Sequence, residues 1–94
     1  MTHEIETRTF TLGSLGITAN ALRSLNEADV LMSIRRHVSC DWGECCPDDA
    51  AANEAALDQD LRLFSVYTDR GGTTFWIITE ADRSATTVLL PEDY

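Results

Sequence analysis

The sequence predicts a single α+β domain over residues 1–94, with an N-terminal strand and two to three helices packed on a C-terminal three- to four-stranded antiparallel sheet. Two observations carry this prediction. Residues 27–38 repeat apolar side chains at the spacing of an amphipathic helix, whereas residues 61–90 switch to strand-like alternation. Residues 1–6 are polar, and we expect them to be flexible.

The first predicted strand covers residues 7–12, where threonine alternates with larger side chains. Thr18 is suited to cap a short helix over residues 19–25, because a threonine hydroxyl accepts hydrogen bonds from first-turn amides. Asn26 is a second cap of this kind, and the helix that it opens ends near His37. The buried stripe expected for this helix consists of Val30, Leu31, Ile34 and Val38.

Pro47 predicts the start of a third helix, since proline is tolerated at the first helical position. Cys46, which precedes the proline, is expected to be extended. Residues 50–60 consist mostly of strong helix formers, and the apolar face of this helix is mainly alanine. Small side chains bury little area, so we expect most of this helix to face water.

Three strand patterns fill the C-terminal third of the chain, at residues 61–68, 73–79 and 85–90. Residues 69–72 are a tight-turn signal, and residues 80–84 form a polar turn. These short connections predict an antiparallel meander. The middle strand is apolar at both alternating sets of positions, so we expect it to be central and covered on both faces.

The net charge of −9 is the strongest functional signal, because sixteen acidic residues oppose seven arginines and no lysine. Such a field repels nucleic-acid phosphates and anionic membranes, which disfavours direct binding of DNA, RNA or lipid surfaces. The field suits a basic protein surface, and most basic surfaces in cells bind nucleic acid. The alternative is that the charge only keeps the protein soluble.

The negative charge is concentrated between residues 41 and 60, a stretch without lysine or arginine. Carboxylates on a helix and its leading loop can imitate the phosphate row of a duplex for the arginines and lysines of a partner. Trp42 is a candidate apolar anchor beside them; alternatively, its ring folds back over the thiols. The predicted partner-binding residues are Asp41, Trp42, Glu44, Asp48, Asp49, Glu54, Asp58 and Asp60.

The same stretch holds the ingredients of a zinc site or a Cys–His nucleophile, namely His37, Cys40, Cys45 and Cys46. Paired C-x2-C spacings are missing, and adjacent cysteines rarely direct both sulfurs at one ion. Neither an oxyanion hole nor an orienting third group is marked. We therefore predict no metal, no cofactor and no catalysis; a small thiol- or zinc-dependent enzyme is the alternative.

The odd number of cysteines argues against a closed disulfide framework and for reduced thiols in a cytosol. The N-terminal residues lack the basic and apolar regions of a signal peptide, and no apolar run reaches membrane-spanning length. These features predict a cytoplasmic protein, and we expect it to be a monomer.

Several segments resemble a family of short acidic proteins that are encoded on plasmids, integrative elements and phages of high-GC proteobacteria. The most specific likeness is in the C-terminal run WIITEADRS followed by TVLLPEDY, and weaker likeness lies in DWGE and in the region LGSLGITA. The resemblance covers most of the chain. Most members of the family have no assigned role, so membership would not by itself name an activity.

Some small acidic proteins of these elements are anti-CRISPR proteins, and this chain resembles a type I-C inhibitor of Pseudomonas-type elements. That resemblance implies binding to the Cascade effector complex in the bacterial host cell, at its large Cas8 subunit. It also implies that bound inhibitor blocks recognition of the protospacer-adjacent motif and target DNA. The alternative is another mobile-element regulator, such as an antirestriction or antitoxin-like protein with a different basic target.

Overall fold

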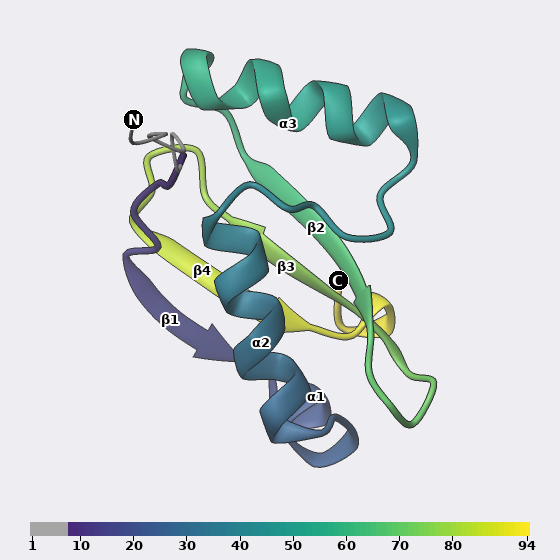
Figure 1. The fold of residues 1–94 in the computed structure, drawn as a ribbon. Coiled ribbons are helices and arrows are strands. Elements are labelled where there is room, and N and C mark those ends of the chain that lie inside the picture. The colour runs from purple at the N-terminus through teal and green to yellow at the C-terminus, as the bar shows by residue number, and fades with distance from the viewer. Residues whose placement is uncertain (1–7) are drawn as a thin grey trace, which may run out of the picture.

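A four-stranded mixed sheet, with strand order β1-β4-β3-β2, organises the chain (Figure 1). The structure is a computed structural model that describes residues 8–94. Its strands are β1 (Ser14–Ile17), β2 (Leu63–Thr68), β3 (Thr74–Thr79) and β4 (Ala85–Leu89). Its helices are α1 (Ala19–Ser24), α2 (Glu27–Val38), α3 (Pro47–Gln59) and the short 3-10 turn η1 (Pro91–Asp93). The predicted α+β class is confirmed.

The predicted helix starts are confirmed by their capping contacts. The Thr18 hydroxyl accepts a hydrogen bond from the Ala21 amide, and the Asn26 side chain accepts one from the Asp29 amide at 3.1 Å. Pro47 is the first residue of α3, and Cys46 before it is extended, with ψ of 159°. Side-chain caps therefore mark the beginning of α1 and α2, and a first-turn proline marks the beginning of α3.

The predicted strand at residues 7–12 is wrong in position: the first strand is β1, and residue 7 lies outside the described residues. β1 runs parallel to β4, with Ser14 opposite Ala85, so the sheet is mixed and not purely antiparallel. Gly13 explains the shift. Its φ is +66°, and an added Cβ would lie 2.3 Å from the Ser84 backbone, so the chain bends there before pairing begins.

The predicted stripe of α2 is partly confirmed, because Val30 is buried and Ile34 packs against the core, but Ser33 and His37 are buried as well. Leu31, expected inside, is 55% exposed. The sheet surface beneath the helix presents hydroxyl groups, and the His37 ring binds two of them. These hydrogen bonds explain how a histidine is accommodated on the buried face of α2, beside Val30 and Ile34.

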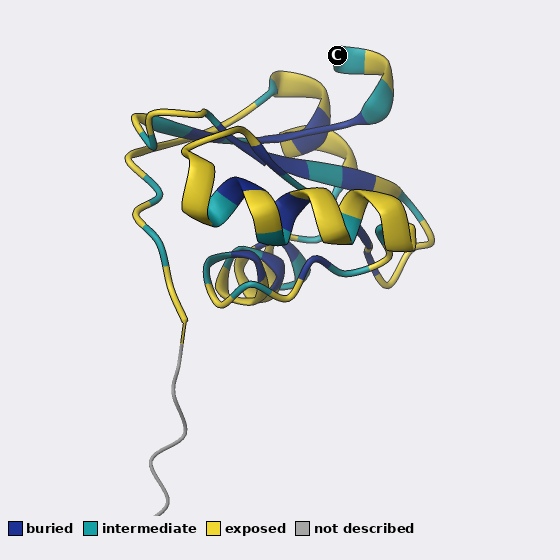
Figure 2. Cartoon of the chain, turned by 90° about the horizontal axis from the view of Figure 1, so that it is seen from above, coloured by how far each residue is buried: buried dark blue, intermediate teal, exposed yellow. Residues whose placement is uncertain are grey.

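The core lies between α2 and one face of the sheet, and the C-terminal turn lies on the other side (Figure 2). In β3, Phe75 and Ile77 are fully buried. Trp76, on the opposite face, packs edge-on against Phe64 and Tyr94, with ring centroids 5.1 and 5.8 Å away. The expected antiparallel meander and the central, doubly covered position of β3 are confirmed. Within residues 8–94, no helix is long and apolar enough to cross a bilayer.

Candidate functional site

The acidic segment begins as a loop that pairs with the outer edge of β2. The Glu44 amide donates to the Val66 carbonyl at 2.7 Å, and the Val66 amide donates to the Trp42 carbonyl at 3.2 Å. Between them, Gly43 has φ of +69°, and an added Cβ would lie 2.0 Å from the Val66 carbonyl oxygen. Only glycine permits this close approach, so Gly43 fixes the path of the loop.

Asn53 attaches α3 to the same strand. Its side-chain amide donates to the Phe64 carbonyl at 2.6 Å and accepts from the Phe64 amide at 3.0 Å, as a neighbouring strand would. Asn53 is not among the site residues predicted from the sequence. One feature of the sequence could have indicated it. Asn53 is a single amide side chain, three residues from both Ala50 and Ala56, on a helix face that otherwise carries small apolar side chains. A polar residue there requires a hydrogen-bond partner from the sheet.

Trp42 is 6% exposed, so it is not available as an exposed anchor. The structure instead shows the alternative, in which the ring folds back over the thiols. The ring packs with Ala56 and Leu63, and Cys40 and Cys45 lie against the same cluster. Trp42 therefore joins the loop and α3 to the sheet.

Two of the predicted carboxylates are held in ion pairs. Asp41 accepts from the Arg36 guanidinium at 2.8 Å, and this contact holds the pKa of Asp41 below its usual range. Glu54 binds Arg8 and accepts from the Trp42 indole at 2.8 Å, and these hydrogen bonds lower the pKa of Glu54. Both groups contribute contacts within the protein, so neither is a free binding group.

The other predicted carboxylates are exposed. Glu44 accepts a hydrogen bond from the Thr68 hydroxyl at 3.0 Å. The remaining four have no ion pair or hydrogen bond to the described part of the chain: Asp48, Asp49, Asp58 and Asp60. We call these four residues the α3 carboxylates. None of the four therefore has a partner side chain in the described part of the chain.

The α3 carboxylates lie at both ends of one helix and point in different directions. Asp48 and Asp49 stand in the first turn, where the helix dipole favours acids. Asp58 and Asp60 stand at the C-terminal end, where the dipole disfavours them. Asp49 borders a hollow beside Trp76, whereas Asp58 borders one beside the N-terminal segment. The charges therefore surround α3 and do not form one flat face.

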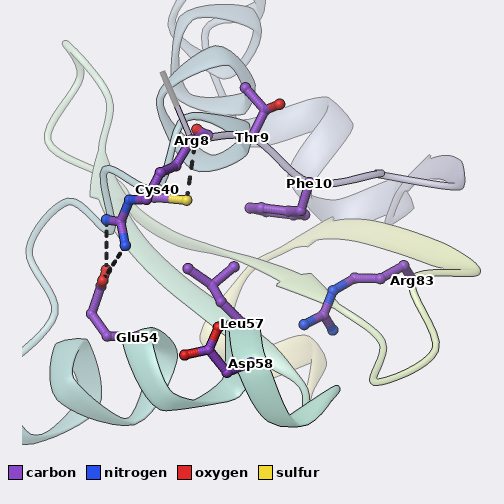
Figure 3. Close-up of a pocket in the computed structure, with 8 residues that line it drawn as sticks. All are labelled: Arg8, Thr9, Phe10, Cys40, Glu54, Leu57, Asp58 and Arg83. Atoms are coloured by element: carbon purple, nitrogen blue, oxygen red, sulfur yellow. Dashed lines mark hydrogen bonds and ion pairs between the residues drawn. The ribbon is translucent and has the colours of Figure 1, made fainter. Parts of the chain in front are cut away.

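An open pocket of about 580 Å³ lies between α3 and residues 8–10, and Figure 3 shows the ion pair of Arg8 with Glu54 at its side. Its second cation is Arg83, from the β3–β4 turn. That guanidinium donates to four backbone carbonyls, those of Ala56, Leu61, Glu80 and Ala81. Both cations already have partners within the protein, so neither is free to bind an anion in this pocket.

His37 is fully buried, and both of its ring nitrogens are occupied. Nδ1 lies 2.5 Å from the Ser65 hydroxyl, and Nε2 lies 2.8 Å from the Thr79 hydroxyl. The network continues from Thr79 to Thr86, whose hydroxyl donates to the Leu12 carbonyl. Burial lowers the pKa of His37 from 6.5 to about 4, so the ring is neutral at pH 7. In this arrangement His37 cannot activate Cys40.

Two of the three thiols, those of Cys40 and Cys45, are partly buried. Burial raises the pKa of Cys40 and of Cys45. A thiol with a raised pKa is mostly protonated at pH 7 and is a poor nucleophile and metal ligand. Over residues 8–94, no three histidine, cysteine or acidic side chains are grouped closely enough to hold a metal ion.

Comparisons with protein-family models, curated proteins and solved structures find no match to this chain.

Proposed function

We propose that the protein is a stoichiometric inhibitor that binds a basic, nucleic-acid-binding protein surface as an acidic DNA mimic. The observation that carries the proposal is the set of α3 carboxylates, which are exposed and have no partner in the described structure. A partner's arginines and lysines pair with carboxylates as they pair with phosphates.

The position of Asp58 and Asp60 supports a role in binding more than a role in folding. Asp58 and Asp60 oppose the dipole of α3, at a cost of about 0.3–1 kcal/mol each for a charge in the last turn. Arg83 donates to the Ala56 carbonyl near this end, yet it forms no ion pair with either residue. Acids kept where they weaken the helix favour a function outside the fold.

The proposed target is the type I-C Cascade effector complex, at its Cas8 subunit, where bound inhibitor would block recognition of the protospacer-adjacent motif. The support is the resemblance to mobile-element anti-CRISPR proteins together with the negative charge of −9. The most specific part of that resemblance includes β3 and β4, which support the fold. The acidic residues would supply affinity and association rate.

The distribution of charge around α3 also describes how the inhibitor would bind. A groove that accepts duplex DNA surrounds its ligand on more than one side, and α3 presents acids on several sides over 13 residues, about 20 Å of helix. With Trp42 buried, the interface would depend mainly on electrostatic contacts, so affinity should fall steeply with salt.

Binding of purified protein to purified type I-C effector complex tests the proposal. Asp58→Asn with Asp60→Asn should weaken binding about tenfold, the equivalent of about 1.4 kcal/mol. The matched control, Asp82→Asn with Glu92→Gln, also removes two negative charges, but from positions outside residues 41–60. It should change binding less than about twofold.

Equal effects of the two pairs would show that only net charge matters and would contradict a site on α3. Absence of binding to the effector would contradict the proposed target. In that case, co-purification from a bacterial host identifies the basic protein that the antirestriction or antitoxin-like alternative requires.

A further inference from the structure

The two edge strands of the sheet, β1 and β2, differ in whether their outward backbone groups have hydrogen-bond partners. The β2 edge is sealed by the Trp42–Glu44 backbone and by the Asn53 side chain. The β1 edge is open. The amides of Ser14 and Thr18 donate to the β4 side, so the alternate residues Leu15 and Ile17 direct their backbone groups away from the sheet. Within residues 8–94, no backbone or side-chain group binds them.

Exposed apolar side chains surround this open edge. They line two adjoining grooves between β1, α1 and α2. Their exposed fractions are 51% for Leu15, 38% for Ile17, 66% for Leu22 and 55% for Leu31. The strand SLGI contains no charge and no proline, which are common devices that keep an edge strand unpaired. The edge thus combines free backbone groups with an apolar surface.

We infer that a second copy of this chain pairs with β1 in antiparallel orientation, which joins two four-stranded sheets across a two-fold axis. In this arrangement, with the two-fold axis at Gly16, Leu15 of each copy lies opposite Ile17 of the other copy, and the Leu31 side chains close over them from above. Each copy supplies both the strand and the apolar cover, as an isologous interface requires.

The charges beside the groove favour a second copy as the occupant. Glu27, Leu31 and Arg35 follow one another at four-residue intervals, so they form one row along α2. With a two-fold axis near Leu31, the two α2 helices are antiparallel, and Glu27 of each copy lies opposite Arg35 of the other. The dimer therefore contains two such pairs. Neither residue has an ion pair in the described structure.

The net charge of −9 opposes self-association, but its concentrated part is distant from this interface. α3 lies beside β2, at the opposite end of the strand order from β1 (Figure 1). A dimer would therefore keep the α3 carboxylates of both copies outward and available. This inference replaces the monomer expected from the sequence, and it does not depend on the proposed target.

Sedimentation equilibrium of the whole protein, from about 5 μM to 1 mM, tests the dimer. Glu27→Arg alone and Arg35→Glu alone should each weaken the dimer about tenfold or more, because each places like charges opposite one another. The double variant restores both pairs and should recover the wild-type dissociation constant to within about threefold. Glu27→Arg is especially informative, since it reduces the overall repulsion and yet should weaken the dimer.

Leu15→Lys should make the protein monomeric, while Leu61→Lys should not. Leu61 is the matched control because it is also 51% exposed and lies outside the grooves. Unchanged circular dichroism of each variant confirms folding. A wild type that stays monomeric over the whole range overturns the inference, and so does a double variant that fails to recover association.

Discussion

The burial of His37 predicts that the stability of this protein depends on pH. The folded protein holds the pKa of the ring near 4, because burial penalises the cation, while the unfolded chain titrates near 6.5. Below pH 6.5 the unfolded state therefore binds more protons than the folded state. Stability is intact above about pH 6.5 and declines as the pH falls toward 4, by up to about 1.4 kcal/mol per pH unit.

Between pH 7 and pH 5, these two pKa values predict a loss of about 2 kcal/mol in the free energy of unfolding. Carboxylates contribute little in this window, since unfolded aspartate and glutamate titrate near pH 4. Urea denaturation at both pH values measures the change. His37→Gln is the control: it loses part of the hydrogen-bond network at pH 7, but its stability should change far less between pH 7 and pH 5. Equal pH slopes for the wild type and the variant would refute the reasoning, as would a measured His37 pKa near 6.5.

Three further predictions concern α3 and the residues that attach it to the sheet. Arg83→Ala should lower the free energy of unfolding by about 2–4 kcal/mol in urea, because four backbone carbonyls lose a charged donor. Asn53→Ala should cost about 1–3 kcal/mol and speed hydrogen exchange of the Phe64 amide, which it leaves unpaired. Asp58→Asn with Asp60→Asn should raise the melting temperature, since each removes an acid from the wrong end of the helix dipole, while it weakens partner binding.

The local rules identified most of the fold. Caps at Thr18 and Asn26, the proline at α3 and the turns between strands are short-range signals, and each was read correctly. The first strand was placed too early, because alternation at residues 7–12 does not show where pairing with β4 starts. That register depends on the contact of Gly13 with Ser84, residues far apart in the sequence.

The candidate site was only partly predictable for the same reason. The concentration of charge is a property of the sequence, but the ion pairs that bind Asp41 and Glu54 within the protein depend on the fold. The sequence places His37 near a helix end and beside cysteines, but it does not show that hydroxyl groups of two strands bind its ring in the core. The open edge of β1 could not be foreseen while the first strand was misplaced.

Competition with target DNA tests the central claim most directly. Type I-C effector complex is mixed with labelled target duplex, and a mobility shift reports how much DNA stays bound as the protein is added. We predict that the wild type releases the DNA at near-equimolar protein and that its inhibition weakens between roughly 0.1 and 0.5 M salt. Reversal of the α3 carboxylates to lysine should leave the DNA bound. Full inhibition by that charge-reversed variant, folded by circular dichroism, would contradict the account.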